Sequence, residues 1–132
     1  MKKNKDNKIK ENLVRAVNKN VRSSTRKVGL ILNGIVGKKV EHAIRDLTFA
    51  NQKVSQEIKK TLHSAIANAE NNFQYDIDKL IVKEAYCGKK IVMKRFRPRA
   101  KGRAAEIMKP YSNVTIILTE KTKQKESHGS KS

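Results

Sequence analysis

The sequence predicts an α+β fold in which three helices pack on a small antiparallel sheet and a long β-hairpin protrudes from that sheet. Apolar residues recur at helical spacing in the first half of the chain and alternate with polar residues in the second half. Helices followed by strands are typical of α+β domains. A strongly basic segment between the two clearest strand patterns predicts the hairpin.

The chain has the length of one domain, with 132 residues of which 37% are hydrophobic, so we expect one modest aliphatic core. We expect a single folded domain over residues 12–119, including an extended hairpin at about residues 86–112. Residues 1–11 are predicted to form a flexible basic arm and residues 120–132 a disordered polar tail. Neither end carries enough apolar side chains to offset the entropy of being ordered.

The first helix is predicted to begin at Ser23 and Ser24, because serine favours the N-cap position. Gly37 supplies its stop signal. The apolar face repeats at helical spacing and consists of Val28, Ile31, Leu32 and Ile35.

Two further helices follow. The short second one has an apolar face, with Lys38, Lys39 and Arg45 turned away from it. Asn51 is the predicted cap of a longer third helix. The third helix has the most regular pattern and is expected to form the centre of the core. The apolar faces of the two helices consist of Val40, Ala43, Ile44 and Leu47, and of Val54, Ile58, Leu62, Ile66 and Ala69.

Strand patterns appear in three places. Residues 80–88 are predicted to be extended, and residues 114–119 alternate in the manner of a good strand. The weaker pattern of residues 13–21 is a candidate third strand.

Residues 89–103 carry eight Lys or Arg side chains and no acidic residue. Their loose alternation predicts that the flanking strands continue as a hairpin, which at about 3.3 Å per residue reaches roughly 40 Å beyond the domain. Pro98 and Gly102 interrupt a ladder, so the far end is expected to be irregular. Such a ribbon is marginal in water and needs a partner to become ordered.

The charge balance identifies the class of that partner. The chain has 31 Lys and Arg against 12 Asp and Glu, a net charge of +19, which costs stability unless a polyanion neutralises it. Nucleic acid is the usual polyanion and an acidic membrane surface is the alternative. Irregular folded RNA suits a basic hairpin better than a DNA duplex, because it offers crevices for arginine forks and for the ring of Phe96.

We expect the RNA-binding residues to lie in the 89–103 segment, in a second acid-free stretch over residues 12–40, and on the third helix. A charge run is more often a solvated surface, but solvated surfaces usually mix charges of both signs. The predicted set comprises Arg22, Arg26, Lys27, Lys38, Lys39, Lys59, Lys60, Lys89, Lys90, Lys94, Arg95, Arg97, Arg99, Lys101 and Arg103.

Nothing in the sequence predicts catalysis, a metal site or a cofactor. The three histidines, His42, His63 and His128, share no ligand spacing with each other or with Cys87, the single cysteine. Asp76 is predicted to form a turn with Asp78 rather than a metal site. Glycines 29, 34 and 37 do not match a phosphate-binding loop. No apolar run reaches 18 residues, so no membrane insertion is expected, and one cysteine fits a reducing, intracellular setting.

Two other functions were weighed against structural RNA binding. A DNA-binding architectural or regulatory protein needs a recognition helix or a dimer, and no predicted helix offers one clearly. An RNA-processing enzyme needs a catalytic acid–base pair or a metal constellation, which is missing.

The order of several motifs resembles the large-subunit ribosomal protein L twenty-two family. They are residues 22–24 (RSS), 27–28 (KV), 37–40 (GKKV), 64–71 (SAIANAEN), 93–95 (MKR), 98–104 (PRAKGRA) and 113–118 (NVTIIL). Together they span about residues 12–119. Two features depart from the family pattern: the chain has extensions at both ends, and residues 89–92 (KKIV) replace a more acidic, glycine-rich stretch.

The resemblance implies a structural protein of the large ribosomal subunit that binds large-subunit rRNA early in assembly. It implies a hairpin that runs through rRNA to the wall of the peptide exit tunnel, with a tip formed by Ala100, Lys101, Gly102 and Arg103 facing the nascent polypeptide. It also implies contacts with neighbouring large-subunit ribosomal proteins, and a cytoplasmic location in a bacterial-type ribosome, with an organellar ribosome as the alternative.

Overall fold

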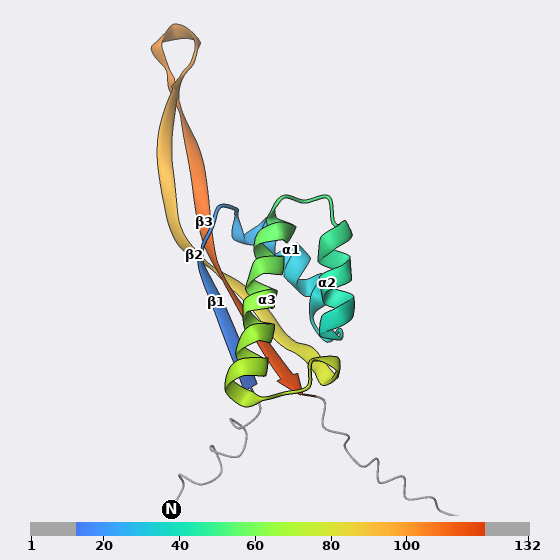
Figure 1. Ribbon diagram of the computed structural model, residues 1–132. Helices are drawn as coiled ribbons and strands as arrows, with labels where there is room; N and C mark the ends of the chain where they lie inside the picture. The colour runs from blue at the N-terminus through green and yellow to red at the C-terminus, as the bar shows by residue number, and fades with distance from the viewer. Residues whose placement is uncertain (1–12, 121–132) are drawn as a thin grey trace, which may run out of the picture.

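A computed structural model describes residues 13–120, and within them the predicted α+β fold is confirmed (Figure 1). Three helices accompany one three-stranded antiparallel sheet of strand order β1-β3-β2. The predicted arm at residues 1–11 and the tail beyond residue 120 lie outside the described residues. The elements are β1 (Leu13–Val21), α1 (Thr25–Ile35), α2 (Val40–Phe49), α3 (Val54–Phe73), the 3-10 turn η1 (Ile77–Lys79), β2 (Leu80–Pro98), the 3-10 turn η2 (Ala100–Gly102) and β3 (Ala104–Glu120).

The last strand of the described residues, β3, lies at the centre of the sheet. It pairs with β1 from Leu13↔Thr119 to Val21↔Ser112 and with β2 along its whole length. Its alternating residues Val114, Ile116 and Leu118 are fully buried, which explains why this strand had the clearest alternation in the sequence. The weaker candidate strand is confirmed as β1, which begins at Leu13 and lies at an edge.

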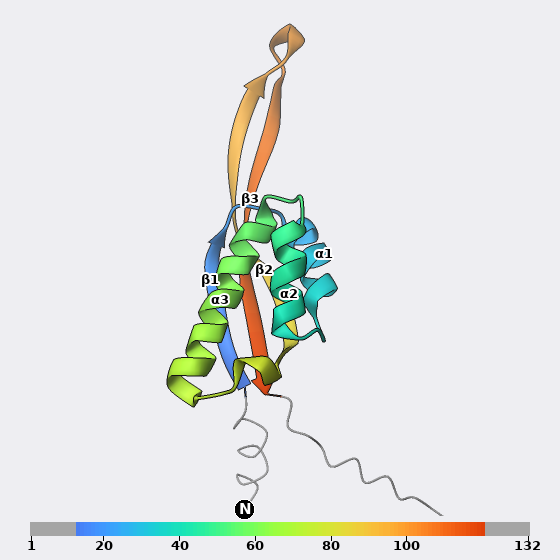
Figure 2. The same cartoon turned by 45° about the vertical axis from the view of Figure 1, so that its right-hand side comes forward.

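Within residues 13–120, the helices cover one face of the sheet and leave the other uncovered (Figure 2). Helix α3 packs on β1 and β3, while α1 packs on β2. Ile58 and Leu62 of α3 and Leu32 of α1 are almost completely buried against the strands. Each such side chain contributes about 1.5–3 kcal/mol by leaving water, so this face holds the domain together.

The predicted cap of the third helix was wrong. Lys53 rather than Asn51 occupies the N-cap position of α3, and no side chain caps that end. The backbone N–H of Ser55 instead donates to the carbonyl of Gln52 at 3.1 Å, so a turn precedes the helix. The first helix follows its prediction at Ser24, which is the N-cap of α1, although its side chain makes no capping hydrogen bond.

The end of α1 is joined to the sheet. Gly37 has a φ of 81°, a left-handed conformation that glycine adopts at no steric cost. Its N–H donates to the carbonyl of Val82 at 2.7 Å, and the N–H of Val82 donates to the carbonyl of Lys38 at 3.0 Å. Gly37 therefore directs the chain from the helix to the edge of β2.

Beyond the domain, β2 and β3 continue as a two-stranded hairpin that projects far past the helices (Figure 1). The ladder runs from Lys89↔Ser112 to Pro98↔Ala104, with an irregularity between Lys89 and Ile91 where the ribbon leaves the sheet. β2 ends at Pro98, and the chain reverses through the η2 turn. From Ile91 onward the ladder is regular up to Pro98, and the expected irregular part is limited to the tip.

Candidate nucleic-acid interface

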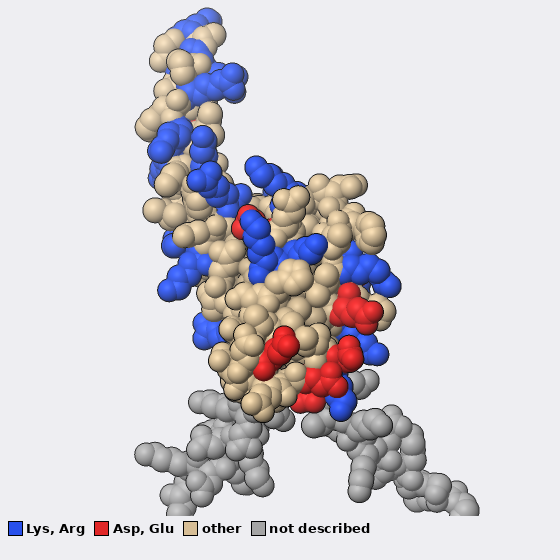
Figure 3. Space-filling model, viewed as in Figure 1, with Lys and Arg blue, Asp and Glu red and all other residues tan. Residues whose placement is uncertain are grey.

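Basic side chains line the hairpin from its base to its tip, whereas most of the acidic side chains visible in Figure 3 gather at the other end of the domain. Every predicted cation of the hairpin is exposed. These residues are Lys89, Lys90, Lys94, Arg95, Arg97, Arg99, Lys101 and Arg103. The one acidic residue between residues 89 and 112 is Glu106, whose carboxylate lies 3.7 Å from the ammonium of Lys94. The hairpin therefore presents a nearly unbalanced positive charge.

The tip is a tight reversal. The N–H of Arg99 donates to the carbonyl of Arg103 at 2.6 Å, which closes the turn. Lys101 and Gly102 both have left-handed backbones, with φ of 63° and 68°. All four residues that were predicted to form the tip, Ala100 to Arg103, lie in this reversal and are exposed.

The hairpin also exposes large apolar side chains. Phe96 is 74% exposed, Met108 61% and Ile91 53%. Water is a poor environment for so many apolar groups on a narrow ribbon. In a crevice of folded RNA, an aromatic ring can stack on a base and aliphatic groups can pack on sugars.

Three side-chain contacts hold the base of the hairpin against the domain. The buried hydroxyl of Ser112 in β3 donates to the carbonyl of Ser23 at 2.6 Å. Lys90 Nζ donates to Asn20 Oδ1 at 2.6 Å, and Cys87 Sγ donates to the carbonyl of Thr25 at 3.4 Å. The loop between β1 and α1 is therefore fixed to β3, and the residues on either side of the loop are fixed to β2.

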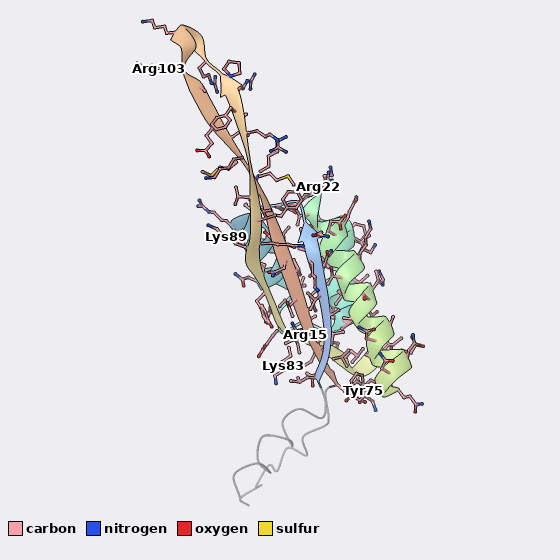
Figure 4. All side chains as sticks on the ribbon, turned by 90° about the vertical axis from the view of Figure 1, so that its left-hand side faces the viewer. Arg15, Arg22, Tyr75, Lys83, Lys89 and Arg103 are labelled. Atoms are coloured by element: carbon pink, nitrogen blue, oxygen red, sulfur yellow. The ribbon has the colours of Figure 1, made fainter. Side chains whose placement is uncertain are left out.

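The structure brings part of the predicted domain residues to the hairpin. Arg22, directly after β1, lies near the base of the hairpin, across the strands from Lys89 in the view of Figure 4. A pocket lies at the base of the hairpin, and Lys27 in the first turn of α1 lines it together with Arg22 and Arg95. Arg26 is exposed beside them in sequence.

The other predicted cations lie away from the hairpin. Lys39 pairs with Ile81 at the opposite end of the sheet, and the ammonium of Lys38 lies 2.7 Å from the carboxylate of Asp46. That hydrogen bond from Lys38 holds the pKa of the Asp46 carboxyl below its usual value. On α3, Lys59 is half-buried and Lys60 lies 3.6 Å from the carboxylate of Glu57.

Lys109 was missing from the predicted set. It follows the 89–103 run in sequence, but the ladder places it opposite Met93, and it lines the pocket at the hairpin base with Arg22 and Lys27. Lys109 lies on the strand that returns from the tip. The sequence would have revealed it if that strand had been counted as part of the same basic surface.

Metal binding and thiol chemistry find no support in the geometry of residues 13–120. Within residues 13–120, no three His, Cys, Asp or Glu side chains gather in a way that could hold a metal ion. Burial raises the pKa of the Cys87 thiol, which disfavours the reactive thiolate. The predicted turn at Asp76 is confirmed, because its carboxylate accepts the N–H of Asp78 at 3.1 Å. No helix in the described part of the chain is long and apolar enough to cross a membrane.

Comparison with known proteins gives a consistent result. Residues 16–119 match the family described as ribosomal protein L22p/L17e. The chain is 69% identical over 131 residues to a protein of Pelagibacter ubique, covering 99% of this chain and 98% of the relative. It is 53% identical over 112 residues to a protein of Maricaulis maris, covering 85% and 89%. It is 51% identical over 107 residues to one of Rhodospirillum rubrum, covering 81% and 85%. All three are named large ribosomal subunit protein uL22.

Proposed function

Because this chain belongs to the ribosomal protein L22p/L17e family and is a structural, non-enzymatic constituent of the large ribosomal subunit, we propose that it binds large-subunit rRNA through its hairpin. The binding supports early assembly of the subunit, and the hairpin lines the nascent-peptide exit tunnel. The observation that carries the proposal is the exposed run of eight cations on a ribbon that has no buried residue between 83 and 111.

Such a ribbon lacks a core of its own. The free energy that offsets its loss of conformational entropy must therefore come from contacts with its surroundings. Each phosphate that a Lys or Arg neutralises releases condensed counterions and adds salt-dependent affinity. Arginine adds forked hydrogen bonds to phosphate oxygens, which a lysine cannot make. The exposed ring of Phe96 adds stacking on an unpaired base.

Within the proposed binding set, the hairpin residues and Arg22, Arg26 and Lys27 form the main contact. Lys38, Lys39, Lys59 and Lys60 belong to a second, weaker contact, because two of them already have an acidic partner in the domain. The relatives named above are bacterial, which favours a bacterial ribosome. Neighbouring ribosomal proteins are the proposed partners of the remaining surface.

A four-residue neutralisation tests rRNA binding. Replacing Arg95, Arg97, Arg99 and Arg103 with Gln is expected to weaken binding to a large-subunit rRNA transcript. It is also expected to flatten the dependence of log K on log salt by about 3, since each of the four lost phosphate contacts contributes about 0.7–0.9. The matched control replaces Arg45, Lys53, Lys79 and Lys83, four exposed cations of the domain. The proposal fails if both variants bind like the unaltered protein across the salt titration.

Crosslinking tests the tunnel assignment. A photoreactive amino acid in place of Lys101 is expected to crosslink to a stalled nascent chain in translating ribosomes. The same group in place of Asn72, an exposed residue of α3, is expected to give no such product. Crosslinks from position 101 to rRNA alone, with nascent chains of every length, would contradict the assignment.

A further inference from the structure

A pocket of about 510 Å³ lies where the hairpin leaves the domain. Four cations line it: Arg22 in the loop after β1, Lys27 in the first turn of α1, Arg95 on β2 and Lys109 on β3. We refer to these four residues and the space between them as the basal notch. Two of the cations belong to the domain and two to the hairpin.

No acidic residue lines the basal notch. The side chains of Arg22, Lys27 and Lys109 make no hydrogen bond or ion pair with another described residue. The guanidinium of Arg95 folds back along its own strand, donating to the carbonyl of Lys94 at 2.9 Å and contacting Met93 Sδ at 3.9 Å. Four like charges around one pocket repel each other, so the arrangement favours an anion between them.

The floor of the basal notch is rigid. Ser23 is buried, its carbonyl accepts the buried Ser112 hydroxyl, and its N–H donates to the carbonyl of Val21 at 2.9 Å. These bonds fix the loop that carries Arg22 and the start of α1 to the central strand. The α1 N-terminus adds a further positive potential, because no side chain caps it and its first turn contains no acidic residue.

Apolar groups form the remaining wall. Met93, Met108, Pro110 and Tyr111 line the pocket together with the cations. A small free anion would be bound by the charges alone and would gain nothing from that wall. A nucleotide strand presents both parts, since its phosphates are anionic and its sugars and bases are largely apolar.

We propose that the basal notch binds the phosphodiester backbone of an rRNA strand and thereby fixes the direction of the hairpin relative to the domain. This rests on the proposed function and adds a separate role to it. The hairpin cations further out supply affinity, whereas a phosphate in the notch neutralises domain and hairpin charges at once. Without it, the repulsion between Arg22 or Lys27 and Lys109 favours a hairpin that bends away from the helices.

Two variants separate the two roles. The notch variant carries Arg22→Gln, Lys27→Gln and Lys109→Gln, and the distal variant carries Arg97→Gln, Arg99→Gln and Lys101→Gln. All six residues are exposed, so substitution is expected to leave the domain folded. A third variant, with Arg45→Gln, Lys79→Gln and Lys83→Gln, removes the same charge elsewhere. Both the notch and distal variants are expected to bind a large-subunit rRNA transcript about tenfold or more weakly, with a salt slope flatter by about 2.

The direction of the hairpin is measured with spin labels on cysteines at Asn72 and Ala104, in a full-length background carrying Cys87→Ser. Saturating rRNA is expected to narrow the distance distribution in the distal variant, as in the protein with all its cations intact. In the notch variant the distribution is expected to stay broad at the same saturation. Narrowing in all variants, or an unchanged affinity of the notch variant, would overturn the proposal. If the distal variant also bound normally, the proposed rRNA function would fall instead.

Discussion

The domain and the distal hairpin, residues 91–109, are built by opposite rules from one chain. All 19 buried hydrophobic residues of the described core lie in the helices and in the parts of the strands beneath them. The distal hairpin has none and exposes Phe96, Met108 and Ile91 instead. Its two strands are held by backbone hydrogen bonds and by the exposed ion pair between Lys94 and Glu106. The domain therefore carries the stability, and the hairpin carries a surface made for an environment outside the protein.

This division leaves the positive charge of the hairpin largely without compensation inside the described part of the protein. In the domain, the burial of apolar surface opposes the repulsion between the positive charges. In the hairpin, nothing comparable opposes that repulsion. Three contacts at the hairpin base, made by Lys90, Cys87 and Ser112, connect the hairpin to the domain. They limit the freedom of the first residues of the ribbon, whereas the distal part makes no such contact with the described residues of the domain.

The largest expected effect is a cavity in the domain. Leu62→Ala removes a fully buried side chain of α3 and is expected to lower the free energy of unfolding by about 2–5 kcal/mol. Phe96→Ala, which truncates a larger side chain on the hairpin, is expected to change it by less than about 0.5 kcal/mol. Urea denaturation followed by circular dichroism measures both. If both variants lost the same free energy of unfolding, the hairpin would contribute to the core and the contrast between hairpin and domain would not hold.

The junction comes next. Ser112→Ala leaves the carbonyl of Ser23 unpaired in a buried place, which is expected to cost about 1–3 kcal/mol. The control Ser64→Ala, at an exposed position of α3, is expected to be neutral or slightly stabilising. Hydrogen exchange of the amides at the hairpin base is expected to accelerate in Ser112→Ala alone. A stable Ser112→Ala protein with unchanged exchange would show that the junction does not depend on this bond.

The sequence predicted the parts of the molecule that follow from periodicity. Val54, Ile58 and Leu62 revealed α3 because apolar residues repeat every turn. Val114, Ile116 and Leu118 revealed β3 because every second residue is apolar and fully buried. The cap at Asn51 was predicted from residue preference alone, and the turn at Gln52 displaced it. Local preferences are weak beside the packing that sets where a helix begins.

The sequence predicted which segment carries the charge of the candidate site, but not which residues the fold brings together there. Charge identified the 89–103 segment, since an acid-free run needs no three-dimensional information to be recognised. Lys109 was missed because only the strand register brings it beside Arg22 and Lys27. In the sequence, Lys38 and Lys39 look like the cations Arg22 and Lys27. The path of the chain after Gly37 nevertheless places them at the end of the sheet that lies away from the hairpin.

A pair of glycine substitutions sharpens the comparison at a smaller scale. Gly34 lies inside α1, and no neighbouring atom comes within 4 Å of the place that an added methyl group would take, so Gly34→Ala is expected to raise the free energy of unfolding by up to about 1 kcal/mol. Gly102→Ala strains the tip, where φ is 68°, by about 1–2 kcal/mol. Because that strain falls outside the cooperative core, thermal unfolding of the domain is expected to stay unchanged. A lower melting temperature for Gly102→Ala would couple the tip to the domain.

The smallest expected effect is the pH response of an exposed ion pair in the domain. The hydrogen bond from Lys38 lowers the pKa of Asp46 below its ordinary value, which is about 3.9 in unfolded chains. A carboxyl with a lowered folded-state pKa stabilises the protein fully above its unfolded-state pKa and loses that contribution as the pH falls through the lowered value. The melting temperatures of the protein and of Asp46→Asn are therefore expected to differ slightly near neutral pH and to converge well below pH 4. Glu106→Gln removes the hairpin's ion pair with Lys94 and is expected to leave domain melting unchanged at every pH, since no core depends on that pair. A difference between protein and Asp46→Asn that grew on acidification would contradict the assigned direction of the pKa shift.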